Sequence, residues 1–113
     1  MTTIGFLGLG RMGAPMAARL VSHVDRLLVH DIAPAAVEAL AAKGAEPAGS
    51  AAALGATCDI VLLSLPTPPV VRAAVDDVLA GGTPRIVCDL STSGPRLAQE
   101  LHALLTPRGV ASF

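Results

Sequence analysis

The chain has 113 residues, of which 52% are hydrophobic and only 15% are charged, and its formal net charge is −1. A chain of this length holds one domain, and its high apolar share predicts a sheet covered on both faces. The lack of a basic cluster, of Trp and of Tyr argues against nucleic-acid binding, so we expect a small-molecule ligand.

Apolar strand-like runs alternate with alanine-rich helical stretches along the whole chain. In chain order, the predicted strands are Thr3 to Leu7, Leu27 to His30, a short one at Ala45 to Pro47, Ile60 to Leu65, Arg85 to Asp89 and Val110 to Phe113. The predicted helices between them are Met12 to Ser22, Pro34 to Ala42, Ser50 to Ala56, Pro68 to Leu79 and Pro95 to Leu105. This alternation is typical of a parallel sheet with crossover helices, so residues 1–113 are expected to form a Rossmann-type, doubly wound α/β domain of three layers.

Several residues mark where the predicted helices begin and end. Ser50 is placed to cap its helix, and Gly44 is placed to stop the one before it. Three prolines stand where a first-turn proline is tolerated: Pro34, Pro68 and Pro95. The last helix carries one apolar stripe, made of Leu97, Leu101, Leu104 and Leu105, which should lie on the sheet.

Signals for a membrane, for secretion and for a metal are missing from the sequence. No apolar run approaches the roughly 18 residues that a spanning helix needs, and the N-terminus does not resemble a secretory signal. We therefore expect a cytoplasmic protein without a membrane partner. Cys58 and Cys88 have no Cys or His at metal-ligand spacing, so both are expected to be buried reduced thiols, and no metal site is predicted.

The segment Gly8-Leu9-Gly10-Arg11-Met12-Gly13 matches the pattern G-x-G-x-x-G between a predicted strand and a predicted helix. Gly8 permits a sharp turn, Gly10 lets the backbone approach a pyrophosphate, and Gly13 lets the helix pack close to the strand. The first N–H groups of the helix would then hold phosphate oxygens, and Arg11 can add a positive charge. The alternative is a glycine-rich turn that binds no ligand.

Asp31 closes the next predicted strand about twenty residues after the glycines, where dinucleotide-binding proteins place an acidic residue. Its carboxylate can accept hydrogen bonds from both hydroxyls of an adenosine ribose, and its charge should repel a 2′-phosphate. Residues 32–38 contain no Arg or Lys that could pair with such a phosphate. NAD is therefore favoured over NADP. The alternative is that Asp31 only caps the helix that begins at Pro34.

Three stretches together resemble the β-hydroxyacid dehydrogenases, a family that includes 3-hydroxyisobutyrate dehydrogenase, tartronate semialdehyde reductase and, more distantly, 6-phosphogluconate dehydrogenase. The opening "IGFLGLGRMGAPMAARL" is similar to the family's N-terminal signature. The stretch "VLLSLPTPPVVRAAV" resembles its Leu-Pro loop after the fourth strand, and "CDLSTSGP" resembles its Asp-x-Ser-Thr loop after the fifth. The resemblance extends over essentially the whole chain.

The resemblance implies positions for further site residues. Leu65, Pro66 and Thr67 would border the cofactor, and Thr92 would contact it near the nicotinamide. The substrate would lie close to Ser91, Thr92 and Ser93. These loops should converge beyond the carboxyl ends of parallel strands, where ligands of such sheets bind. The alternatives are that Pro66 only stops a strand and that the serines only cap the helix at Pro95.

The chain also departs from the family. Arg19 stands where relatives often have an asparagine, and the lysine that transfers the proton in the family, with the glycine-rich loop before it, is missing. Lys43 is the only lysine, and it follows the second predicted helix, away from the carboxyl-end loops. The three histidines, His23, His30 and His102, are expected to have ordinary structural or surface roles. No catalytic residue is predicted within the chain.

These patterns predict the N-terminal NAD-binding part of an enzyme that moves a hydride between nicotinamide and a small 3-hydroxy acid or semialdehyde. Because the sequence stops at "GVASF" in the last predicted strand, we expect it to be truncated and to lack a C-terminal helical domain through which the family forms homo-oligomers. The alternatives are an imine or semialdehyde reductase of the same superfamily, or a nucleotide-binding domain without catalysis.

Overall fold

Six parallel strands form one sheet within residues 2–91 and 94–113, which are the residues that the computed structural model describes. The strands are β1 (Thr3–Leu7), β2 (Arg26–His30), β3 (Glu46–Pro47), β4 (Ile60–Leu63), β5 (Ile86–Asp89) and β6 (Ala111–Ser112). Their order in the sheet is β3-β2-β1-β4-β5-β6, and every neighbouring pair is parallel. The chain therefore winds outward from β1 to β3 and then returns to place β4 beside β1, which confirms the doubly wound Rossmann-type fold.

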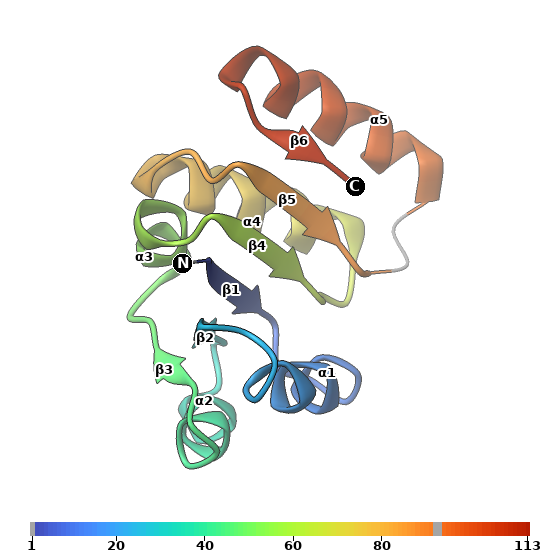
Figure 1. The fold of residues 1–113 in the computed structure, drawn as a ribbon. Helices are drawn as coiled ribbons and strands as arrows, with labels where there is room; N and C mark the ends of the chain where they lie inside the picture. Colours follow the sequence, from blue (N-terminus) through green and yellow to red (C-terminus); the bar gives the residue numbers. More distant parts are fainter. Residues whose placement is uncertain (1, 92–93) are drawn as a thin grey trace.

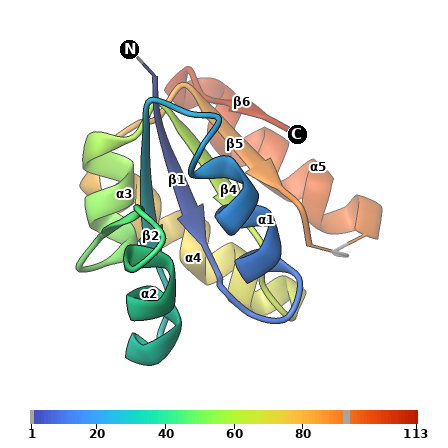
Figure 2. The same cartoon turned by 60° about the horizontal axis from the view of Figure 1, so that its bottom comes forward.

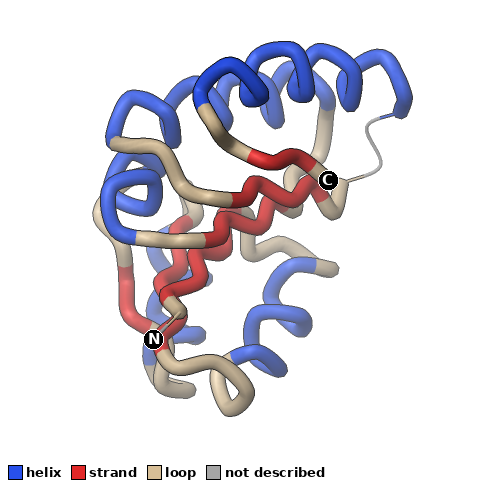
Figure 3. The backbone as a smooth tube through the Cα atoms, turned by 45° about the horizontal axis from the view of Figure 1, so that its top comes forward, coloured by secondary structure: helices blue, strands red, loops and turns tan. Residues whose placement is uncertain are grey.

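Helices cover both faces of this sheet (Figure 1). On one face, α1 (Gly13–Leu20) and α2 (Pro34–Ala41) pack against a core centred on Phe6, Val29 and Leu40. On the other face lie α3 (Ala51–Thr57), α4 (Pro68–Gly81) and α5 (Gly94–Leu105), the last followed by a short 3-10 turn at Thr106–Arg108. Figure 3 shows the strands as one band between these two groups of helices. None of the described helices is both long and apolar enough to cross a membrane.

Local signals in the sequence place most helix ends correctly. The Ser50 hydroxyl accepts a hydrogen bond from the N–H of Ala53 at 3.1 Å, which confirms the predicted cap of α3. Gly44 has a φ of +111°, the left-handed conformation that ends a helix and favours glycine. Pro34 and Pro68 occupy the first turns of α2 and α4, and Leu97, Leu101 and Leu105 are buried beneath α5 with Leu104 packed beside them.

Some predicted boundaries are wrong by a few residues. Helix α1 begins at Gly13 and ends at Leu20, rather than running from Met12 to Ser22, and α4 continues to Gly81. Strand β4 stops at Leu63, two residues before the predicted end. The N–H of Ser64 still donates to the carbonyl oxygen of Leu7, but the N–H of Leu65 donates to a side chain instead of a strand carbonyl, so the ladder ends there.

The two cysteines differ in burial. Both are free thiols, as predicted, and Cys58 is only 5% exposed. Burial raises the pKa of the Cys58 thiol to about 11. Cys88 is only half-buried, so the prediction of full burial is wrong for it. It lies on the face that α1 and α2 cover, and these helices pack mainly against β1, β2 and β3, leaving β5 less covered.

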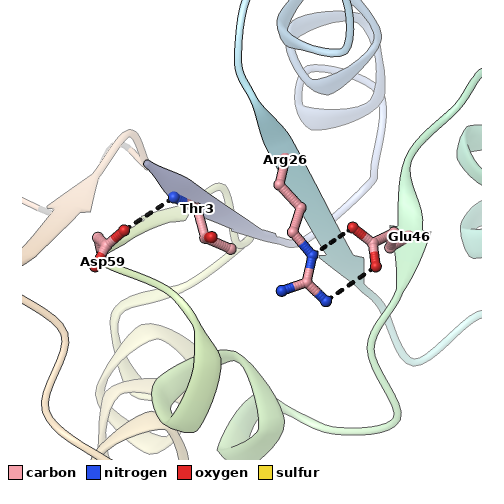
Figure 4. A network of polar contacts seen from close by, with 4 residues as sticks. All are labelled: Thr3, Arg26, Glu46 and Asp59. Atoms are coloured by element: carbon pink, nitrogen blue, oxygen red, sulfur yellow. Dashed lines mark hydrogen bonds and ion pairs between the residues drawn. The ribbon is translucent and has the colours of Figure 1, made fainter. Parts of the chain in front are cut away.

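Polar contacts tie the strands together at the amino-terminal edge of the sheet (Figure 4). The N–H of Thr3 donates to the Asp59 carboxylate at 2.9 Å, and the Arg26 guanidinium bonds both carboxylate oxygens of Glu46, at 2.6 and 3.0 Å. The hydrogen bond from Arg26 lowers the pKa of Glu46. These contacts lie at the edge opposite to the loops that carry the predicted ligand-binding residues, so the two edges of the sheet have separate roles.

Candidate functional site

The glycine loop connects the end of β1 to the start of α1, and two of its glycines are required by the fold. Gly8 has a φ of +99°, and a Cβ at this position would overlap the Ser64 carbonyl oxygen of the neighbouring β4 segment. A Cβ at Gly13 would overlap the carbonyl oxygen of Gly8, so α1 can approach β1 this closely only with glycine. Both roles agree with those predicted from the sequence.

Gly10 differs from the other two glycines because the fold does not require it. It is exposed, and a Cβ added there would meet no atom within 4 Å. The N–H groups of Gly10, Arg11 and Met12 have no hydrogen-bond acceptor among residues 2–91 and 94–113. The start of α1 thus combines unpaired backbone donors with open space at the side-chain position of Gly10, an arrangement that can receive an anion.

Asp31 joins the end of β2 to the glycine loop. One carboxylate oxygen accepts a hydrogen bond from the N–H of Leu9 at 2.6 Å, and the other accepts one from the N–H of Ala33 at 2.9 Å. The N-cap of α2 is Ala33, so the alternative role of Asp31 as the cap of that helix is wrong. Asp31 remains half-buried at the cleft, where its carboxylate oxygens keep further lone pairs for hydrogen bonds.

A cleft of about 530 Å³ opens at the carboxyl ends of β1, β2 and β4. Figure 2 shows the loops after β1 and β4 meeting at this edge of the sheet. The cleft is lined by Leu7, Gly8, Gly10, Arg11, Met12, Gly13, His30, Asp31, Ile32, Ser64, Leu65, Pro66 and Val70. The fold therefore brings the glycine loop, Asp31 and the Leu-Pro loop together around one space.

Two predicted residues lie at the cleft without lining it. The Leu9 side chain is 4% exposed and belongs to the core, so this residue contributes only its backbone N–H. The Thr67 hydroxyl accepts a hydrogen bond from the N–H of Val70 at 3.4 Å, which makes Thr67 the N-cap of α4. The residue that lines the cleft from this helix is Val70, 43% exposed. Sequence reasoning missed Val70, although an apolar residue in the first turn after two prolines was a signal for it.

Ser91 occupies the loop after β5. Its hydroxyl oxygen accepts a hydrogen bond from the N–H of Leu65 at 2.7 Å, and its own N–H donates to the Asp89 carboxylate at 2.8 Å. It also lines a second cavity of about 290 Å³, together with Asp89, His102, Ser112 and Phe113. Thr92 and Ser93, the other residues predicted near the substrate, lie outside the described residues.

Lys43 and His30 differ in their distance from the cleft. Lys43 follows the end of α2, which runs from the carboxyl edge of the sheet back to its amino edge, so it does not line the cleft. His30 lines the cleft, and its Nδ1 lies 3.1 Å from the carbonyl oxygen of Ala48. The described part of the chain contains no group of three His, Cys, Asp or Glu side chains placed to hold a metal ion.

Known proteins resemble this chain over almost its whole length. Residues 3–113 match the family described as the NAD binding domain of 6-phosphogluconate dehydrogenase. A probable 3-hydroxyisobutyrate dehydrogenase of Mycobacterium tuberculosis is 44% identical over 97% of this chain, which spans 38% of that relative's length.

Solved structures show the same likeness. A structure of the Mycobacterium tuberculosis 3-hydroxyisobutyrate dehydrogenase with L-serine has a TM-score of 0.91 and 43% identity, covering 99% of this chain and 39% of that one. Psf3, solved with NADP+ and 2-OPP, has a TM-score of 0.86 and 30% identity, covering 96% of this chain and 40% of that one.

Proposed function

The chain belongs to the β-hydroxyacid dehydrogenase family as its N-terminal NAD-binding domain, and from this membership we propose that it binds NAD(H) in preference to NADP(H) for hydride transfer with a small 3-hydroxy acid or its semialdehyde. One observation carries the proposal: Gly10 and Asp31 line the same cleft, and the space that a side chain of residue 10 would occupy is open. Bound nicotinamide supplies the hydride chemistry, and the chain supplies binding and orientation.

The start of α1 fits a pyrophosphate. The N–H groups of Gly10, Arg11 and Met12 can donate to phosphate oxygens, and the positive end of the helix dipole adds to this attraction. Arg11 is exposed on the rim of the cleft, where its guanidinium can pair with a phosphate. Gly10 leaves the backbone accessible to this group because it has no side chain.

The preference for NAD(H) is supported by the charges around β2. The Asp31 carboxylate can accept hydrogen bonds from ribose hydroxyls, whereas a 2′-phosphate would meet its negative charge. Ile32, the next residue, is 97% exposed and lines the cleft without offering a positive charge. Of the described residues that line the cleft, Arg11 is the only arginine or lysine, and it belongs to the glycine loop.

The adenosine half of the cofactor is assigned to the β2 side of the cleft, so the nicotinamide half is assigned to the β4 side. Leu65 and Pro66 would then border the nicotinamide, with the predicted substrate residues Ser91, Thr92 and Ser93 following the neighbouring strand. We assign no proton-transfer role to any residue of the chain. In the whole protein, the proton-transfer lysine that the family resemblance implies would come from a C-terminal helical domain. The same domain would supply the surface for homo-oligomer formation.

Titration calorimetry of the chain with NADH and with NADPH tests the proposal. We expect NADH to bind at least about tenfold more tightly, a difference of about 1.4 kcal/mol. Ile32→Arg should shift the preference toward NADPH without removing the Asp31 contacts to the backbone. Ala39→Arg is the matched control, because it adds the same charge at an exposed position of α2 outside the cleft. Equal affinities for both cofactors would refute the role of Asp31, and no binding of either would refute the proposed function.

A further inference from the structure

The loop that carries Ser91 is held at the ends of both β4 and β5. Beyond the end of β5, the N–H of Leu90 donates to the carbonyl oxygen of Leu63 at 2.8 Å, so the loop still follows β4. The N–H of Ser91 then donates to the Asp89 carboxylate at 2.8 Å. These two contacts direct the Ser91 hydroxyl at the backbone of Leu65, where it accepts a hydrogen bond at 2.7 Å.

The hydrogen bond between Ser91 and Leu65 fixes the wall of the cleft that Leu65 and Pro66 form, a segment with few other backbone donors. Leu65 and Pro66 both line the cleft, and proline has no backbone N–H. The N–H of Leu65 is therefore the last main-chain donor of this segment before Thr67. Because it donates to Ser91 across 26 positions of sequence, the position of this wall depends on the loop after β5.

The opposite flank of the cleft has the same kind of contact, a loop N–H that donates to a side chain following the adjacent strand. Leu9 lies two residues beyond the end of β1, as Leu65 lies two residues beyond the end of β4. The N–H of Leu9 donates to the Asp31 carboxylate at 2.6 Å, and Asp31 follows the neighbouring strand β2. Each central strand thus has its following loop held by a side chain from the end of the adjacent strand.

We propose that Ser91 is a positioning residue for the nicotinamide half of the cofactor, acting through its hydrogen bond to the Leu65 backbone. This inference rests on the proposed function of the cleft, and it adds a role beyond the substrate contact that the family resemblance implies. Ser91 also lines the second cavity with Asp89, so the same residue faces that cavity and holds the wall of the cleft. The adenosine half, held by the loops after β1 and β2, does not depend on it.

The test compares Ser91→Ala, Ser91→Thr and the unaltered chain in their affinities for NADH and ADP. The alanine variant lacks the acceptor for the Leu65 N–H, so NADH affinity should fall by about three- to tenfold, the range expected for one such hydrogen bond. ADP affinity should not change, because ADP lacks the nicotinamide half. The threonine variant keeps a hydroxyl and should restore NADH binding. Ser112→Ala, which removes a hydroxyl from the same second cavity, should leave both affinities unchanged.

Amide hydrogen exchange at Leu65, measured by NMR without nucleotide, provides a second readout. Exchange should become faster in Ser91→Ala and stay unchanged in Ser112→Ala. Unchanged NADH affinity in Ser91→Ala would overturn the positioning role, and so would a parallel loss of NADH and ADP binding. If the unaltered chain binds neither nucleotide, the proposed function fails and this role fails with it. If the unaltered chain binds NADH and Ser91→Ala binds it with the same affinity, only the role of Ser91 is refuted.

Discussion

Gly10 and Gly13 stand three residues apart in the same loop, yet substitution should affect them in opposite ways. A Cβ at Gly10 meets no atom within 4 Å, and its φ is not in the left-handed region, so Gly10→Val should change the free energy of unfolding by no more than about 0.5 kcal/mol. A Cβ at Gly13 overlaps the Gly8 carbonyl oxygen, so Gly13→Ala should cost about 2 kcal/mol or more.

Gly10→Val should have a large effect on cofactor binding, although its effect on the free energy of unfolding is small. Its side-chain position faces the space assigned to the pyrophosphate, so valine would hold the phosphate away from the N–H groups at the start of α1. Each hydrogen bond to a charged group contributes about 1.5–3 kcal/mol. Losing two of them corresponds to a loss of about 100-fold or more in NADH affinity.

NADH fluorescence titration and urea unfolding measure the two effects separately. We expect Gly10→Val to unfold like the unaltered chain and to lose NADH binding. Gly13→Ala should lower the free energy of unfolding in urea by about 2 kcal/mol or more. NADH binding that survives in Gly10→Val would show that the loop is only a turn. Equal destabilisation by the two substitutions would refute the assignment of the open space in front of Gly10.

Further predictions concern residues outside the glycine loop. The chain should form no NADH from NAD+ and 3-hydroxyisobutyrate, because an acid or base within reach of the substrate is worth about 100- to 10,000-fold in rate and none is assigned here; turnover by the chain would contradict this. Lys43→Ala should leave NADH affinity unchanged in calorimetry, since Lys43 lies at the far edge of the sheet, and a clear loss of affinity would contradict that placement. Burial raises the pKa of Cys58 from its ordinary value near 9 to about 11, so this thiol contributes stability that is fully present below about pH 9 and is lost as the pH rises through 11. In urea unfolding, Cys58→Ser should reduce that loss, and an unchanged pH dependence would argue against it. Arg26→Ala should leave the midpoint of urea unfolding almost unchanged, because both partners of its ion pair with Glu46 are exposed, and a clear shift of that midpoint would contradict this expectation.

Local features of the sequence determined the elements and the central motif. Alternating apolar and alanine-rich runs predicted all six strands and five helices of the described residues, because periodicity follows directly from side-chain direction along the chain. Ser50 and Gly44 were placed correctly because each acts on backbone groups within a few residues. The spacing of Gly8, Gly10 and Gly13 in the G-x-G-x-x-G pattern likewise encodes a turn and a helix start.

Only the tertiary structure decided which side chains hold the walls of the cleft. Asp31 reaches Leu9 across 22 positions of sequence, and Ser91 reaches Leu65 across 26, because parallel pairing places the ends of β2 beside β1 and of β5 beside β4. The same pairing ended β4 at Leu63, where a neighbouring side chain replaced the next strand carbonyl. A sequence pattern specifies the period of a strand but not its neighbour, so contacts between loops of adjacent strands became visible only once the order of the sheet was known.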